Sequence, residues 1–182
     1  MGFLEAVVVL YLRRLLGIGF ADVAAAPAGP TWLALRGMEL EREAATVVMI
    51  LAVALLAGRG WRGRLGAFAF VFGVWDLSYY VWLALLVGWP RGLLDWDLLF
   101  LIPAPWWGPV LAPALVAVVL VAAGIRFLRQ GASLAARPTG AALAALGAGA
   151  IFAAFLLAVP GHFPWALYLP ALALFTAGMA RW

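Results

Sequence analysis

Asp76 is an isolated charge near the middle of a long apolar stretch, residues 65–89. An apolar stretch of this length can span a bilayer. An ionisable group at that depth costs about 2.5 to 3.5 kcal/mol on insertion scales, so the folded protein must solvate it. Tyr79 and Tyr80 lie one helical turn further on and Trp75 precedes it, which makes these four residues a candidate binding site. They predict a site for a proton, a cation or a small cofactor. The equal alternative is a hydrogen-bonded aspartate that fastens two helices.

A second group of polar residues could bind a divalent metal ion, because carboxylate oxygens and one imidazole suit such ions. The candidate ligands are Glu39, Glu43, Asp95, Asp97 and His162. Their spacing matches no recognised metal motif. Glutamates near a helix start are also favoured by the helix dipole, and a lone histidine between prolines is typical of a loop.

The case for an enzyme rests on carboxylates alone. The sequence contains no nucleophile elbow, no phosphate-binding glycine loop and no paired-histidine motif. The absence of cysteine excludes thiolate metal sites and disulfides within one subunit. If the chain is an enzyme, we expect it to act on a lipid or quinone at the outer leaflet, with Glu39, Glu43, Asp97 and His162 as acid–base or metal residues.

The composition identifies the setting of these residues. A hydrophobic content of 68% and a mean hydropathy of +1.08 exclude an ordinary soluble domain. The pI near 10.3 does not indicate nucleic-acid binding, because the arginines lie in short loops between apolar segments.

The apolar segments predict an all-α fold, a polytopic transmembrane helical bundle with five to six spans in one domain over residues 1–182. The first span is uncertain, because Arg13 and Arg14 lie near its centre and could instead snorkel from an interfacial helix. The predicted spans are residues 2–20, 42–58, 65–89, 109–125, 139–159 and 164–180.

Small residues predict how the helices pack. Gly66, Ala69 and Gly73 share one helical face with Asp76, and in lipid such a stripe allows a second helix to approach closely. Asp76 should therefore face protein or an internal cavity. A similar stripe in residues 139–159 contains Gly140, Ala144, Gly147 and Ala148.

Residues 95–108 form the connection that prolines break, and we expect a re-entrant or interfacial segment there. Asp95 could cap a short helix over residues 96–102, followed by a turn. Tryptophans in and around this segment are typical of the membrane interface.

Loop charges predict the orientation. Arginines gather in residues 59–64 and 126–137 and at Arg181, so these loops should be cytoplasmic in a bacterial-type inner membrane. The acidic loops would then lie outside.

The first functional prediction is a binding or conducting protein with Asp76 as its buried carboxylate. The alternatives are a non-catalytic accessory subunit of a larger membrane complex and the outer-leaflet enzyme. Expected partners are membrane lipids and either further copies of the chain or a larger complex, with a lipid, a quinone or a divalent metal as candidate ligands.

Overall fold

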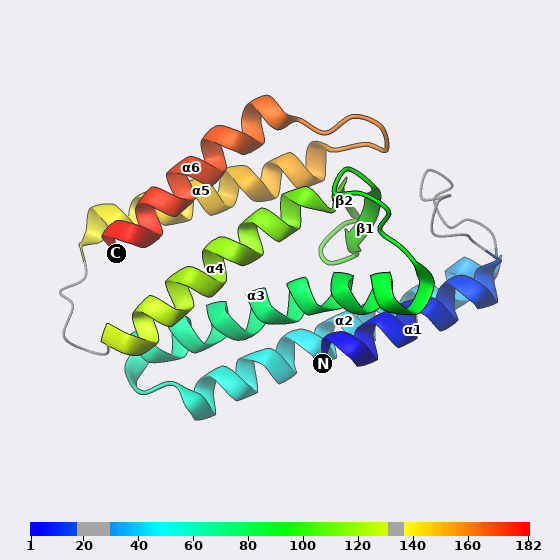
Figure 1. The fold of residues 1–182 in the computed structure, drawn as a ribbon, viewed down its shortest axis with the longest axis horizontal. Helices are drawn as coiled ribbons and strands as arrows, with labels where there is room; N and C mark the ends of the chain where they lie inside the picture. The colour runs from blue at the N-terminus through cyan, green and yellow to red at the C-terminus, as the bar shows by residue number, and fades with distance from the viewer. Residues whose placement is uncertain (18–29, 131–136) are drawn as a thin grey trace.

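Six helices and one β-hairpin make up the part of the chain that the structure describes (Figure 1). The structure is a computed structural model that describes residues 1–17, 30–130 and 137–182, with the backbone alone at 30–35 and 130. The elements are α1 (Gly2–Leu16), α2 (Pro30–Ala57), α3 (Gly60–Val87), β1 (Trp96–Phe100), β2 (Trp106–Pro109), α4 (Leu111–Gln130), α5 (Pro138–Leu157) and α6 (Trp165–Arg181).

Three of the described helices are long and apolar enough to cross a membrane: α3, α4 over Leu111–Arg129, and α5. They correspond to the predicted spans 65–89, 109–125 and 139–159, which are confirmed as membrane-compatible helices. The total of five to six spans stays a prediction. The predicted span 2–20 coincides with α1 as far as Leu16, and its residues 18–20 lie outside the described part of the chain.

Glycines bring α3 and α4 into close contact, as the stripe on residues 65–89 predicts. A Cβ on Gly73 would lie 2.6 Å from the carbonyl oxygen of Ala117, and a Cβ on Gly124 would lie 2.7 Å from that of Gly66. Both distances are shorter than real Cβ contacts, so the two backbones approach where side chains are absent. The expected packing of this stripe on another helix is therefore confirmed.

The second stripe joins α5 to α6. Gly147 lies against the backbone of Phe175, and Gly178 lies against Ala144. Tyr168 of α6 is fully buried, and its hydroxyl donates to the carbonyl oxygen of Ala112 at 2.5 Å, which ties this helix pair to α4.

The connection between α3 and α4 is a β-hairpin, so the short helix expected over residues 96–102 is wrong. β1 and β2 pair antiparallel, with Asp97 opposite Gly108 and a bulge between Leu98 and Phe100. Aromatic residues, which are frequent in this segment, favour strands. The prolines lie in the loop between β1 and β2, where their missing N–H groups cost no ladder hydrogen bond. Asp95 caps backbone instead: its Oδ2 accepts from the N–H groups of Arg91 and Gly92 at 2.6 and 3.3 Å.

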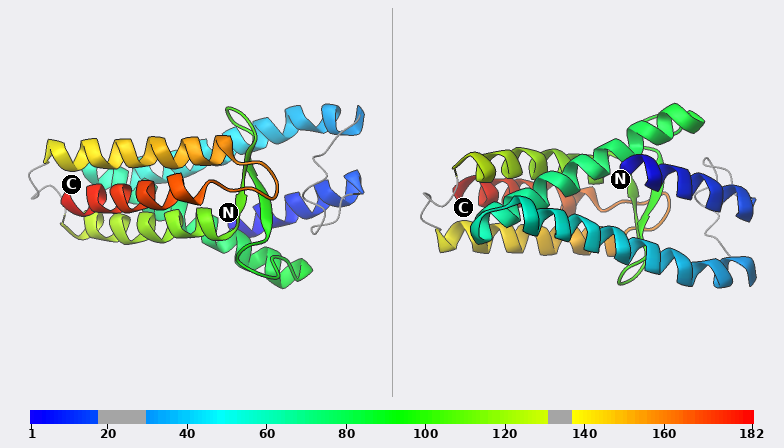
Figure 2. Two further views of the ribbon diagram at one scale, coloured as in Figure 1. Left: turned by 90° about the horizontal axis from the view of Figure 1, so that it is seen from above. Right: turned by 90° about the horizontal axis from the view of Figure 1, so that it is seen from below.

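α1 and α2 are placed differently from the other helices. α1 begins against the second half of α3: a Cβ on Gly2 would overlap Ser78, and Ala6 is fully buried. α1 and the start of α2 then extend past the hairpin, beyond the ends of α4, α5 and α6 (Figures 1 and 2). Polar residues of these two helices thereby come level with the hairpin and the later part of α3.

Candidate functional site: a charged cavity beside the hairpin

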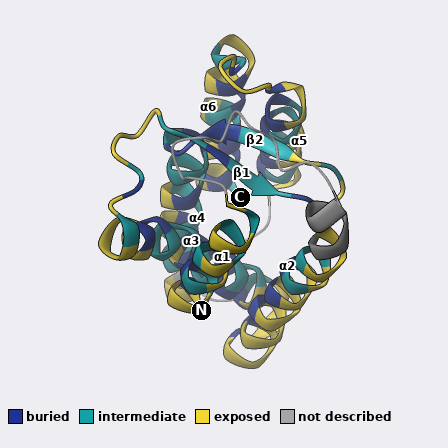
Figure 3. Cartoon of the chain, turned by 90° about the vertical axis from the view of Figure 1, so that its right-hand side faces the viewer, coloured by how far each residue is buried: buried dark blue, intermediate teal, exposed yellow. Residues whose placement is uncertain are grey.

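A cavity of about 330 Å³ lies between α1, α2, α3, the hairpin and the start of α4. Figure 3 views the molecule from the end where α1 and α2 project, with these elements arranged in a ring. The charged residues of its lining come from four elements: Glu5 and Arg13 of α1, Glu39, Arg42 and Glu43 of α2, Asp76 of α3, and Asp97 of β1.

Asp76 reaches this cavity because its helical face continues the glycine stripe beyond the point where α4 covers it. Trp75, Tyr79 and Tyr80 line the same cavity, so all four predicted binding residues are part of one site. Among the described residues, Asp76 makes no hydrogen bond and no ion pair. The hydroxyl of Tyr80 donates to Asp97 and not to Asp76, with 3.4 Å between Tyr80 Oη and Asp97 Oδ2.

Asp97 enters the cavity from β1 and has only 2% of its surface exposed. Its second carboxylate oxygen, Oδ1, lies 3.3 Å from Nη2 of Arg13 in α1. Burial raises the pKa of Asp97 to about 6, and the Arg13 guanidinium acts in the opposite direction. The guanidinium also lies over the ring of Trp89, 5.8 Å from its centroid. Asp97 therefore joins the hairpin to both α1 and α3.

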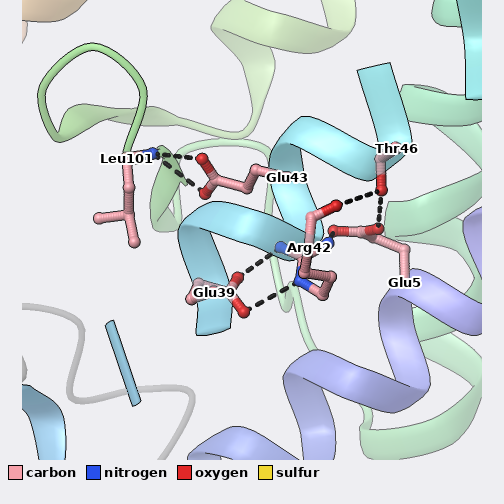
Figure 4. A network of polar contacts seen from close by, with 6 residues as sticks. All are labelled: Glu5, Glu39, Arg42, Glu43, Thr46 and Leu101. Atoms are coloured by element: carbon pink, nitrogen blue, oxygen red, sulfur yellow. Dashed lines mark hydrogen bonds and ion pairs between the residues drawn. The ribbon is translucent and has the colours of Figure 1, made fainter. Parts of the chain in front are cut away.

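A second polar cluster, the Arg42 network, joins α1 to α2 and consists of Glu5, Glu39, Arg42 and Thr46 (Figure 4). Arg42 forms ion pairs with Glu5 of α1 and with Glu39 one turn earlier in α2. Its Nε donates to Glu39 Oε2 at 2.9 Å. Thr46 donates to the carbonyl oxygen of Arg42 at 3.1 Å and lies 3.5 Å from Glu5. One guanidinium thus serves two carboxylates on different helices.

Glu43 of α2 holds the residue that follows the C-terminal end of β1. Its side chain has only 4% of its surface exposed, and both carboxylate oxygens lie 3.0 Å from the backbone N–H of Leu101 (Figure 4). Leu101 follows β1 directly, where the strand pairing has ended. The carboxylate therefore satisfies a buried donor that the sheet leaves free.

The charges in the cavity lining do not balance. The lining contains five carboxylates and two guanidinium groups, so ionised carboxylates are in excess. Arg13 and Arg42 pair with Asp97, Glu5 and Glu39, and Glu43 accepts a backbone N–H. Asp76 is left as the carboxylate without a described partner. An unpaired carboxylate in such a site is expected to hold a proton or to bind a cation.

The aromatic part of the lining forms a continuous wall from α3 to the hairpin. Phe72 contacts Trp75 at a ring-centroid distance of 5.3 Å, Trp75 contacts Phe100 at 6.0 Å, and Phe100 contacts Trp106 at 5.7 Å. Trp75 immediately precedes Asp76, so the wall adjoins the unpaired carboxylate.

The residues predicted as metal ligands do not form one centre. Glu39, Glu43 and Asp97 line the cavity, but each is engaged by Arg42, Leu101 or Arg13 as described above. Asp95 caps the turn before β1, and His162 is exposed in the turn between α5 and α6. Over residues 1–17, 30–130 and 137–182, no group of three or more histidine, aspartate or glutamate side chains could hold a metal ion.

Sequence reasoning missed Glu5, Arg13 and Arg42 as parts of the site. Glu5 and Arg13 are charges in an apolar segment, as Asp76 is, and such charges need partners inside the protein. This signal could have identified both residues. Nothing in the sequence indicates which partners they have.

Comparison with protein-family models, with curated proteins and with solved structures finds no match to this chain.

Proposed function

We propose that this chain is an integral membrane protein of five to six spans whose cavity binds a cation or a proton, with Asp76 as the ligand-binding carboxylate. The observation that carries the proposal is the unpaired Asp76 in a cavity lining with excess carboxylates. Intramembrane carboxylates that face an internal cavity are typical of proton and ion sites.

The distribution of arginines supports the bacterial-type inner-membrane topology. The α2–α3 connection, the end of α4 and the C-terminus lie at one end of the bundle, and the hairpin and the α5–α6 turn lie toward the other (Figure 1). Arg59, Arg126 and Arg181 belong to the first end. On the positive-inside rule this end is cytoplasmic, which places the cavity nearer the outer surface.

A quinone is a poorer ligand for this lining than a cation. Quinone oxygens accept hydrogen bonds, but Arg13 and Arg42 donate to carboxylates. The unpaired carboxylate of the lining, Asp76, accepts hydrogen bonds when ionised, and it suits a ligand that carries positive charge or donors.

Carbodiimide labelling tests the proposal in the purified protein. Dicyclohexylcarbodiimide modifies protonated carboxyl groups in apolar surroundings, and mass spectrometry locates the modified residue. We expect labelling at Asp76 that rises as pH falls and is reduced at constant pH by at least one member of a panel of inorganic and organic cations. Asp95→Asn, which changes a carboxylate outside the cavity, should leave that labelling unchanged.

Labelling of Asp76 that responds neither to pH nor to any cation in the panel would contradict the proposal. Where labelling is protected, flux measurements in proteoliposomes distinguish binding from conduction. Loss of flux in Asp76→Asn with retained folding would assign conduction, and absence of flux in the wild type would assign binding alone.

A further inference from the structure

We propose that the ligand of this cavity is an amphipathic organic monocation, an ammonium group attached to an aromatic or branched hydrocarbon body, which competes with a proton for Asp76. This inference rests on the proposed function and names the chemical class of the ligand.

The size and donor set of the cavity favour an organic ligand over a bare inorganic ion. At about 330 Å³ the cavity falls within the range of small-molecule pockets, roughly 300 to 1,000 Å³. Inorganic cations need several oxygen ligands to replace their hydration shell. Asp76 supplies one carboxylate, and the described residues offer no group of three or more acidic or histidine ligands.

The aromatic wall provides the second half of the recognition. Phe72, Trp75, Phe100 and Trp106 belong to the cavity lining, and each ring contacts the next. An ammonium group is attracted to the face of an aromatic ring by about 0.5 to 2 kcal/mol, most strongly where water is excluded. A carboxylate next to such rings is the combination that recognises substituted ammonium ions.

Aliphatic side chains also line the cavity. Val9, Leu12 and Leu16 of α1 and Val47 of α2 belong to the lining. They can cover the hydrocarbon body of a ligand, whose burial contributes about 25 cal/mol per Å² of apolar surface. The cavity therefore combines a carboxylate that selects charge with apolar side chains that select a hydrocarbon body.

One lining carboxylate is left for the ligand to pair with. Four of the five lining carboxylates already have described partners, so Asp76 is the one that can pair with a cationic group. A single ammonium group is enough to form that pair. Without a bound cation the same carboxylate is neutralised most easily by a proton, so cation binding releases that proton.

Direct binding measurements test this assignment with a matched pair of ligands. Benzyltrimethylammonium and its neutral carbon isostere neopentylbenzene have nearly the same shape and differ in charge. Binding to the protein in lipid nanodiscs can be followed by fluorescence, because Trp75 and Trp106 line the cavity. We expect the cation to bind at least about tenfold more tightly than the isostere, with affinity falling toward a limit of about tenfold per pH unit in acid.

Variants assign the effect to Asp76. Asp76→Asn should lower the affinity for benzyltrimethylammonium at least about tenfold at neutral pH and abolish its pH dependence, with the isostere little affected. Asp95→Asn should bind both compounds as the wild type does. Since Asn is close in size to Asp, a folded variant is expected, and an unchanged affinity for the isostere confirms it.

Equal affinity for the two compounds, or wild-type cation binding by Asp76→Asn, would overturn the proposal. Failure of this ligand assignment is distinguishable from failure of the proposed cation site. If inorganic cations protect Asp76 from carbodiimide but benzyltrimethylammonium neither binds nor protects, the ligand class is wrong and the cation site stands.

Discussion

Arg42 should be the residue whose loss most weakens the attachment of α1 to α2. Its guanidinium pairs with Glu5 and Glu39, and the three side chains are only 20%, 12% and 11% exposed. Exposed pairs contribute about 0 to 1 kcal/mol, and breaking a buried pair costs about 3 to 5 kcal/mol. At this partial exposure we expect Arg42→Gln to lower the free energy of unfolding by about 2 to 3 kcal/mol, because two carboxylates then face each other without a cation.

A double-mutant cycle isolates that interaction. Glu5→Gln keeps the Arg42–Glu39 pair, so it should cost only about 1 kcal/mol. In the double variant one of the two opposed carboxylates is gone, so the combined loss should fall short of the sum by about 1 to 2 kcal/mol. Arg91→Gln, at an exposed position with no described side-chain ion pair, is the control.

The measurement is reversible unfolding in detergent, followed by tryptophan fluorescence, on the wild type and the four variants. Additive losses within about 0.5 kcal/mol would show that Arg42 and Glu5 do not stabilise each other. So would a loss in Arg42→Gln no larger than the loss in Arg91→Gln. Either result would mean that solvent or lipid headgroups already satisfy Glu5 and Glu39.

Three further predictions concern stability. Because burial raises the pKa of Asp97 from about 4 in the unfolded chain to about 6, this residue alone should lower the free energy of unfolding by up to about 3 kcal/mol as pH rises from 4 to 6. Asp97→Asn should make the dependence of that free energy on pH shallower by this amount in unfolding curves recorded across the range, and an unchanged slope would contradict this prediction. Gly124→Ala should lower the free energy of unfolding by about 1 to 3 kcal/mol in the same assay, because the added methyl group meets the backbone of α3. Gly149→Ala, whose methyl group meets open space, should be neutral or slightly stabilising. Equal effects of the two changes would show that α3 and α4 are not in close contact. Tyr168→Phe should cost about 1 kcal/mol through loss of the hydrogen bond to the carbonyl oxygen of Ala112, and a neutral result would show that this bond does not stabilise the fold.

The long helices were predictable because their signals are local. Residues 65–89 and 139–159 are apolar runs between arginine-rich or proline-containing segments, and the structure places α3 and α5 within a few residues of them. The glycine stripes also indicated the packed faces, since small residues at helical spacing have few other uses in a membrane.

The hairpin was not predictable from the same signals. Asp95 before an apolar run resembles a helix cap, and the prolines that follow fit either a helix end or a strand turn. The choice is made by tertiary contacts: Trp96 packs on Phe163, and Gly108 lies against Phe155. Such contacts join residues more than 45 positions apart, and local patterns do not contain them.

The site itself was predictable only in part. The cost of burying Asp76 identified it from the sequence alone, and the lining includes its three predicted neighbours. The convergence of Glu5, Arg13 and Asp97 on the same cavity depends on how α1 and the hairpin fold over α3. Asp95 and Asp97 look equivalent in sequence, yet one caps an exposed turn and the other is buried against Arg13.

In the mechanism that we propose, Asp76 exchanges a proton for a cationic ligand. Infrared difference spectroscopy tests it most directly, because protonated and ionised carboxyl groups absorb at different frequencies. Addition of benzyltrimethylammonium at mildly acidic pH should remove one protonated-carboxyl band, and that change should be absent in Asp76→Asn and present in Asp95→Asn. A saturating cation that leaves the protonated-carboxyl region unchanged, or the same change in Asp76→Asn, would contradict the account.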